Sequence, residues 1–515
     1  MSFRISKRRS GGDGQRRWGA VVAICGLVIL FAPPLCAQSR DLAEKSRRAK
    51  ELMDLGKPGE AVPLYRELVR AVPGNPGLIV DFGLALDMSG SKSEAIRQYQ
   101  SALKINASFF PALLLLGTAY LDLGQPAKAV DPLERSLGVQ PDSLDAQQTL
   151  AEALFELGRL PEAERRFREI ARLDPRSSKA WYGLGLCYEG LAQRSFDALA
   201  KIAPGSAYWL DLVGESRLEA KQDYSAFYFY RQAFSKMPQM RGVHMALARV
   251  YEDTGHSDWA AVEEQKEKQL PPPDCRAQRL ECQFQARNFV DVIETSEGLT
   301  TPEAYYWRTR AYNKLALNAY SELGQLPPSA EAHELEAKID SQRRQYAESA
   351  KEWREALVYS PENRYVQTQL AIALYKSGDL AGAQALFEQL IKEQPEAADL
   401  NFYLGDTLLN AQKPQAALPY LEKAILRDPA LLAAQKSIGL AYLQTGQAER
   451  AIVHLKAALP IDEDGSARYQ LARAYQTAGK KELAAAMLKE YQQKQQEEQN
   501  ENASVEKDVA LTPPD

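Results

Sequence analysis

The chain has 515 residues, of which 45% are hydrophobic and 25% charged, and its formal net charge is −5 at pH 7. This balance indicates a folded chain and disfavours nucleic acid as a partner, because nucleic-acid binding relies on a strongly basic surface. No shift in composition divides residues 40 to 490. One long array is therefore expected rather than several unrelated globular domains.

The first 37 residues read as a signal peptide. Basic residues precede an apolar run from Trp18 to Ala32, and Ala37 is a small residue suited to cleavage before Gln38. The run is shorter than the ~20 residues of a comfortable membrane span. We therefore expect export, with a mature chain that is periplasmic or secreted and not inserted in a membrane; bulky Leu35 leaves an uncleaved inner-membrane anchor as the alternative. The basic residues are Arg4, Lys7, Arg8, Arg9, Arg16 and Arg17.

Three cysteines would remain after cleavage, in a compartment that permits disulfides. If one continuous helix held Cys275 and Cys282, their Cα atoms would be ~10 Å apart, beyond disulfide reach. A disulfide between them requires the helix to begin after Cys275, which the prolines of segment 271–274 permit. Cys187 lies on an apolar helix face and is expected to be a small buried residue.

A pattern of small, apolar and turn-forming residues recurs with a period of 34. Each copy reads as two amphipathic helices, with a small residue where they approach each other and a glycine that reverses the chain. The same offsets return in the C-terminal half at Ala371, Gly378 and Ala383. One clear copy consists of Gly117, Tyr120, Gly124, Ala129 and Pro141.

The repeated residues resemble the tetratricopeptide repeat, and the run from Trp181 to Tyr188 matches the first-helix signature of that family at every key position. The resemblance extends over almost all of residues 42 to 498, in an expected fourteen units. It implies an all-α fold, a right-handed α-solenoid of tandem helix-turn-helix repeats. Neighbouring units in such an array share one continuous core.

Two regions depart from the repeat in the same way. Tyr188 and Tyr312 belong to segments that align at a constant offset of 124, which indicates a duplicated block. Both segments lack the turn glycine, and their second helix is expected to be short. If the array divides, the boundary is expected near Pro271 to Asp274. The predicted organisation is a signal peptide at 1–37, an N-terminal array at 38–274 with a shortened unit near 178–206, an irregular unit at 275–301, a C-terminal array at 302–498 with a shortened unit near 302–329, and a disordered tail at 499–515.

No constellation of residues in the sequence predicts catalysis. The histidines His244, His256, His333 and His454 are isolated, and no Cys/His cluster has zinc spacing. The sequence has neither the Gly-x-Ser-x-Gly elbow of hydrolases nor a phosphate-binding loop. We therefore expect a protein that is not an enzyme and binds no cofactor or metal.

Binding is expected instead on the concave face that the first helices of such repeats form. The positions that face this groove in the family are mostly apolar here, and they lack the paired Asn and Lys or Arg with which some family members hold a terminal carboxylate. The expected partner is a protein or peptide segment recognised along its length. The candidate groove residues are Val80, Leu84, Leu114, Leu121, Phe155, Tyr182, Leu186 and Tyr208.

These features favour a non-catalytic scaffold for protein–protein interactions in the bacterial cell envelope. An alternative is an accessory component of polysaccharide export or secretion, in which such an array works with a channel formed by a separate chain. An enzyme would need an unrecognised site in the irregular stretch 275–301.

Overall fold

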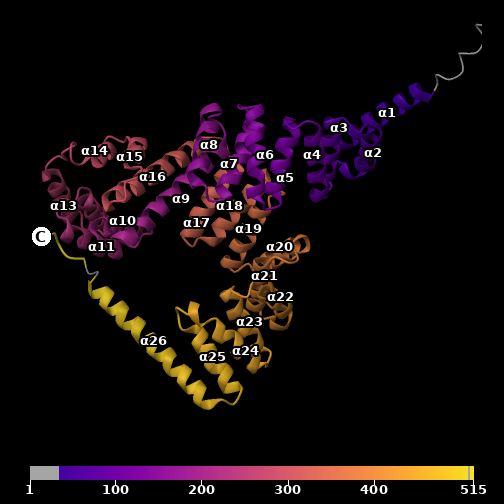
Figure 1. Ribbon diagram of the computed structural model, residues 1–515. Helices are drawn as coiled ribbons and strands as arrows, with labels where there is room; N and C mark the ends of the chain where they lie inside the picture. Colours follow the sequence, from indigo (N-terminus) through magenta and orange to yellow (C-terminus); the bar gives the residue numbers. More distant parts are fainter. Residues whose placement is uncertain (1–33, 509–510, 515) are drawn as a thin grey trace, which may run out of the picture. The chain divides into compact units, whose positions relative to one another are not determined.

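The computed structural model describes residues 34–508 and 511–514, which form 26 α-helices, one short 3-10 helix and no strand (Figure 1). The predicted all-α repeat architecture is confirmed. The predicted signal peptide lies outside the described residues, except that α1 begins at Pro34. The described residues divide into two compact units, one that ends at Ala153 and one that begins at Leu154.

The described part of the first unit consists of consecutive antiparallel helix pairs with a shared core. Its helices are α1 (Pro34–Asp54), α2 (Pro58–Ala71), α3 (Pro76–Met88), α4 (Lys92–Ile105), α5 (Phe110–Asp122) and α6 (Pro126–Val139), and α7 (Leu144–Glu156) crosses the division.

Small residues allow the two helices of a pair to approach closely. A Cβ atom on Gly83 of α3 would lie 2.5 Å from the Cε1 atom of Tyr99 on α4, and one on Gly117 of α5 would lie 2.4 Å from the Cγ atom of Leu133 on α6. Both partners are fully buried. The 34-residue period is therefore a packing requirement: a side chain at these positions would force the helices apart.

The second unit continues the repeat and contains both copies of the duplicated block. Its helices are α8 (Leu160–Leu173), α9 (Ser178–Ile202), α10 (Ala207–Glu219), α11 (Asp223–Lys236), α12 (Val243–Asp253), α13 (Ser257–Gln269), α14 (Arg279–Gln285), α15 (Phe289–Ser296), α16 (Pro302–Gly324), α17 (Ala330–Gln342), α18 (Tyr346–Tyr359), α19 (Arg364–Ser377), α20 (Leu380–Glu393), α21 (Ala398–Asn410), α22 (Pro414–Arg427), α23 (Leu432–Gln444), α24 (Ala448–Ala457), α25 (Ser466–Thr477) and α26 (Lys481–Asp508).

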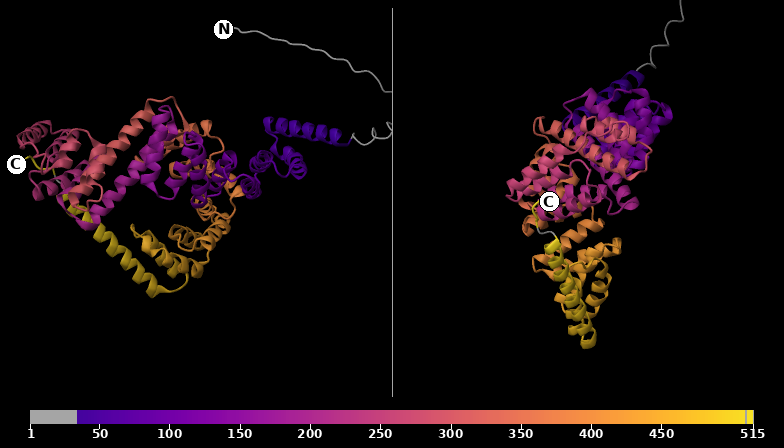
Figure 2. Two further views of the ribbon diagram at one scale, coloured as in Figure 1. Left: turned by 45° about the horizontal axis from the view of Figure 1, so that its top comes forward. Right: turned by 90° about the vertical axis from the view of Figure 1, so that its left-hand side faces the viewer.

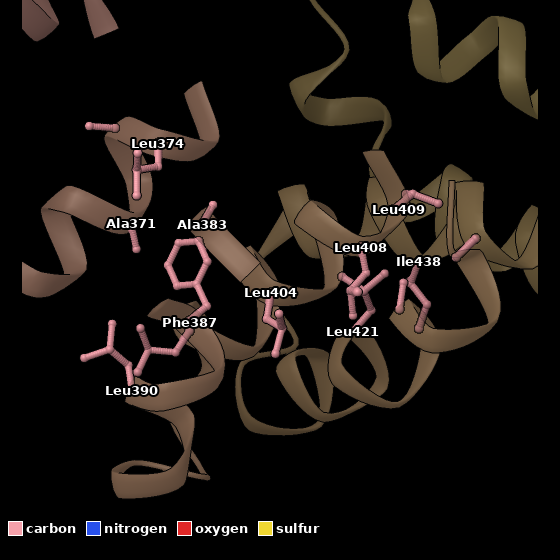
Figure 3. Packing of buried hydrophobic residues seen from close by; sticks show 14 of the residues in the cluster. Ala371, Leu374, Ala383, Phe387, Leu390, Leu404, Leu408, Leu409, Leu421 and Ile438 are labelled. Carbon is pink, nitrogen blue, oxygen red and sulfur yellow. The ribbon is translucent and has the colours of Figure 1, made fainter. Parts of the chain in front are cut away.

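From α17 to α26 the helix pairs share one continuous apolar core. Figure 3 shows Phe387 of α20 beneath Ala371 of α19, with the buried leucines of α21 and α22 beyond it. The ring of Phe387 also stacks on Tyr403 of α21, with 5.6 Å between centroids. Each pair thus buries apolar surface against the next, as expected of a solenoid whose units are not stable alone.

The two irregular segments differ from the sequence prediction. Segments 178–206 and 302–329 were expected to contain a first helix and a short second one, but α9 and α16 are unbroken helices of 25 and 23 residues. The reason is the missing turn glycine, since no residue with a left-handed backbone ends the first helix.

The long helices α9 and α16 pack against each other, although 124 residues separate equivalent positions (Figures 1 and 2). A Cβ atom on Gly185 of α9 would lie 2.0 Å from Cε1 of Tyr320 on α16. In a regular pair the partner of this glycine lies 16 residues later, as Tyr230 does for Gly214. Helix α16 thus supplies the partner that a separate second helix after α9 would have provided.

This packing also explains why the chain does not divide near Pro271. The boundary was expected near Pro271–Asp274, whereas the chain divides between Ala153 and Leu154. The contact between α9 and α16 joins the helices before and after Pro271 into one unit, so a proline-rich loop inside it is not a domain boundary.

The predicted disordered tail is wrong over most of its length. Helix α26 continues through Asp508, and the described residues 511–514 lie beyond it. The segment after Tyr491 is rich in Gln, Glu and Lys, which have high helix propensity. A lack of large apolar residues therefore does not prevent this segment from being helical.

Candidate functional site

Six of the eight predicted groove residues are half-exposed on first helices of their pairs. Leu84 lies on α3, and Leu114 and Leu121 lie on α5, so these three share the first unit. The other three are Phe155, Leu186 and Tyr208. Leu84, Leu114 and Leu121 remain candidates for partner contact.

Two predicted groove residues are buried and cannot meet a partner, so the prediction is wrong for them. Val80 is 5% exposed within the core of the first unit, and Tyr182 is 8% exposed beneath α17. The Tyr182 hydroxyl lies 3.2 Å from a carboxylate oxygen of Glu334 and accepts a hydrogen bond of 2.5 Å from Lys338 Nζ. The face of α9 that was expected to be open is covered because α17, which follows α16, packs on it.

A second polar cluster occupies the equivalent place in the other copy of the block. Tyr306, which lies 124 residues after Tyr182, donates a hydrogen bond of 2.8 Å to Asp211 on α10 and accepts one of 2.6 Å from Arg310. Burial raises the pKa of Asp211 to about 6, while the neighbouring guanidinium opposes that rise. The guanidinium of Arg310 also lies over the ring of Phe284, 5.2 Å from its centroid.

The two clusters therefore anchor the junction between the copies. In each, a tyrosine on a long helix meets a carboxylate on the helix that follows the other long helix. Both tyrosines have a pKa raised above the usual range, with burial as the largest cause. These groups are paired within the chain, which fits a role in packing rather than in ligand binding.

A cavity of about 410 Å³ lies beside this junction, between α8, α9 and α16. Trp181 and Leu184 of α9 and Leu315 of α16 contribute apolar surface to it. The Trp181 indole N–H donates to the carbonyl of Pro175 at 2.9 Å, which holds the ring in place. Arg172 and Glu322 add charge to the lining.

A second cavity, of about 350 Å³, adjoins the first and extends to α15. Arg168, Tyr188 and Leu315 line both cavities, and we refer to the two together as the α8–α16 groove. Tyr188 donates a hydrogen bond of 2.9 Å to Glu164 and stacks on Tyr312, its equivalent in the other copy, with centroids 6.1 Å apart.

The α8–α16 groove can accept apolar side chains beside groups of both charges. Its cavities fall in the range of ~300–1,000 Å³ typical of ligand pockets. None of the eight residues predicted from the sequence lines it. The 124-residue offset was the only sequence signal that pointed to this groove. It indicates a duplication, but it does not indicate that the two copies pack against each other.

The acidic, histidine and cysteine side chains of the described residues are dispersed along the helices. Residues 34–508 and 511–514 contain no group of three His, Cys, Asp or Glu side chains that could hold a metal ion. His244 instead lies 2.5 Å from buried Glu263 and His333 lies 2.7 Å from Glu352, in each case across a helix pair. The same part of the chain has no helix with the length and apolar character needed to cross a membrane.

The irregular stretch 275–301 contains a disulfide between Cys275 and Cys282, whose Cα atoms are 5.6 Å apart. Helix α14 begins at Arg279, after Cys275, so the two cysteines do not lie on one continuous helix and can form the bond. Cys187 is a buried free cysteine, and burial raises the pKa of its thiol to about 12. A protonated, buried thiol is unreactive.

The fold defines an all-helical repeat protein, of a class that mediates protein–protein interactions. Two models of the tetratricopeptide repeat match the sequence, one over residues 46–109, 80–146, 368–430 and 404–467 and the other over 120–187. The chain belongs to the tetratricopeptide-repeat family.

Individual relatives are distant. BBSome complex member BBS4 of Bos taurus is 25% identical over 168 residues, which are 31% of this chain and 32% of that protein, so the chain spans about a third of this curated relative. A tetratricopeptide repeat protein from Parabacteroides merdae is 15% identical, with a TM-score of 0.32 over 65% of this chain and 99% of that one. MamA from Desulfovibrio magneticus is 22% identical, with a TM-score of 0.30 over 33% and 96%.

Proposed function

We propose that this chain is an exported scaffold of the bacterial cell envelope and that the α8–α16 groove holds a segment of a partner protein. The observation that carries the proposal is the pair of adjoining cavities between helices that the family repeat does not normally bring together. Aromatic and leucine side chains there can bury apolar residues of a partner, and the arginines and glutamates around them can fix its register.

The envelope setting is supported by two features that are far apart in the sequence. The N-terminal residues have the order of a signal peptide. The bond between Cys275 and Cys282 is of a kind that persists in oxidising compartments.

The half-exposed leucines of α3 and α5 offer a second apolar surface, on the first unit.

The groove is tested by a charge placed inside it. Leu315→Asp puts a carboxylate on the wall shared by both cavities, and partner capture is expected to fall at least about tenfold, equivalent to ~1.4 kcal/mol. Leu317→Asp is the matched control, because Leu317 lies on the same helix and is 55% exposed. The measurement is recovery of partner proteins after in-cell photo-crosslinking from position 318, where exposed Asn318 lines the groove.

Equal recovery with Leu315→Asp, Leu317→Asp and the unchanged chain would rule out this groove as the partner site. Circular dichroism of the two variants separates loss of binding from loss of folding. Cell fractionation in the same experiment tests the setting: recovery only with the inner membrane would contradict a cleaved, exported chain.

The disulfide gives an independent prediction about the compartment. A chain recovered from the periplasm, denatured without reductant and treated with iodoacetamide is expected to gain one alkyl group, on Cys187, and three after reduction. Loss of the bond in Cys282→Ser is expected to cost about 2 kcal/mol, because the bond closes a short loop. Three alkyl groups before reduction would contradict an oxidised chain.

A further inference from the structure

The described segment Leu511–Pro514 lies against helices that precede it by about 260 residues. Tyr251 of α12 donates a hydrogen bond of 2.6 Å from its hydroxyl to the carbonyl oxygen of Thr512. Leu511 is half-buried and packs against the apolar cluster that contains Tyr251 and Phe227. The contact thus combines one apolar side chain with one directed hydrogen bond.

The regular stacking of helix pairs stops after α12 and α13. Helices α12 and α13 form a pair, but the next two helices have only seven and eight residues, and these pack on each other and on α16. The ring of Tyr251 is held between Phe227, at 5.6 Å, and Trp259, at 5.5 Å. His256 in turn stacks on Trp259 at 4.3 Å. The hydroxyl of Tyr251 is therefore presented from a fixed aromatic frame.

The chemistry of the segment suits such a frame. Thr512 precedes a proline, which favours an extended backbone, and Pro513 and Pro514 have no N–H group and little freedom to lose. An extended proline-containing segment exposes its carbonyls as acceptors and binds at a low entropic cost. A tyrosine hydroxyl beside aromatic rings offers the matching donor and apolar surface.

We propose that the end of the α12–α13 pair is a peptide-binding site for an extended segment with a leucine two residues before the first of two consecutive prolines, and that residues 511–514 of the same chain occupy it. A contact of this size is weak between separate molecules. Attachment to the same chain raises the effective concentration of the segment to about the millimolar range, which favours occupancy. A partner segment of the same chemistry would have to displace it. This proposal does not depend on the α8–α16 groove.

The first test is hydrogen exchange of the full chain. Leu511→Asp is expected to speed exchange of the amides in α12 and α13 about fivefold, because the bound segment no longer protects them. Thr512→Ala is the matched control, since it keeps the backbone carbonyl that accepts from Tyr251 and changes only an exposed side chain. Thr512→Ala should therefore exchange like the unchanged chain.

The second test supplies the segment from outside. A fluorescein-labelled peptide with the sequence of residues 509–514 is expected to bind full-length Leu511→Asp at least about fivefold more tightly than the unchanged chain, whose own segment competes. Adding Tyr251→Phe to Leu511→Asp should weaken peptide binding about fivefold, the effect of one net hydrogen bond.

Identical exchange in all variants, together with equal peptide affinity for Leu511→Asp and the unchanged chain, would overturn the proposal. Protection that rises with protein concentration would show that the occupant comes from a second copy and would overturn occupancy within one chain. A peptide that binds Leu511→Asp and the double variant equally would remove Tyr251 from the site.

Discussion

Gly185→Ala is expected to destabilise the second unit by about 3 kcal/mol, at the upper end of the usual cost of overpacking. The added Cβ atom would lie 2.0, 2.5 and 2.6 Å from three ring atoms of Tyr320. A ring packed between two long helices cannot give way by that distance without moving the helices. Urea unfolding followed by circular dichroism measures the change.

A double-mutant cycle isolates this contact. Tyr320→Ala removes the ring, so Gly185→Ala in that background is expected to cost close to nothing, and the two changes should be strongly non-additive. Gly324→Ala serves as the control on α16, because no atom lies within 4 Å of its added Cβ atom. That variant is expected to leave stability unchanged or raise it by up to ~1 kcal/mol. Additive costs would show that α16 does not pack against Gly185.

The local repeat could be predicted from the sequence because its contacts lie a fixed number of residues apart. Gly117 and Leu133, or Gly405 and Leu421, meet because 16 residues carry the chain along one helix, through the turn and back along the next. The residue types at those positions are set by how closely the helices approach. A period of 34 therefore predicts both the fold class and the role of each small residue.

The junction between α9 and α16 could not be predicted by the same reasoning. Tyr320 takes the place of a partner that the repeat would put 16 residues after Gly185, and nothing local in the sequence specifies this replacement. The sequence shows that the turn glycine is absent, but the pattern around it predicts a short second helix and not one long helix. The groove prediction failed at Tyr182 for the same reason, since Glu334, on the helix that covers it, lies 152 residues further on.

The two polar clusters at the junction differ in where they carry their positive charge. Around Tyr182 the cation is Lys338 on α17, whereas around Tyr306 it is Arg310, on the same helix as the tyrosine. The duplicated copies have thus diverged while each kept a cation beside its buried carboxylate. Buried carboxylates need such a partner, because an unpaired charge in the interior is costly.

Arg310→Met is therefore expected to destabilise the second unit by about 3–5 kcal/mol near neutral pH, the usual cost of removing one partner of a buried ion pair. The guanidinium lies 3.9 Å from Asp211 and 3.7 Å from Glu215, and both carboxylates would lose it. Methionine keeps most of the apolar volume over the aromatic rings. Arg354→Met, at an exposed position of α18, is the matched control and should change stability by less than ~0.5 kcal/mol.

The cost of Arg310→Met should also depend on pH in a defined direction. Burial raises the folded-state pKa of Asp211 to about 6, above its unfolded value of about 4, so this group removes stability as the pH rises between those values. Arg310 is the largest influence that lowers this pKa. Without it the pKa rises further, and the loss of stability continues to higher pH. Urea unfolding should therefore show a larger cost at pH 8 than at pH 5.5, and Asp211→Asn combined with Arg310→Met should remove most of that difference. An equal cost at both pH values would mean that Arg310 acts through its packing on the aromatic rings and not through its charge.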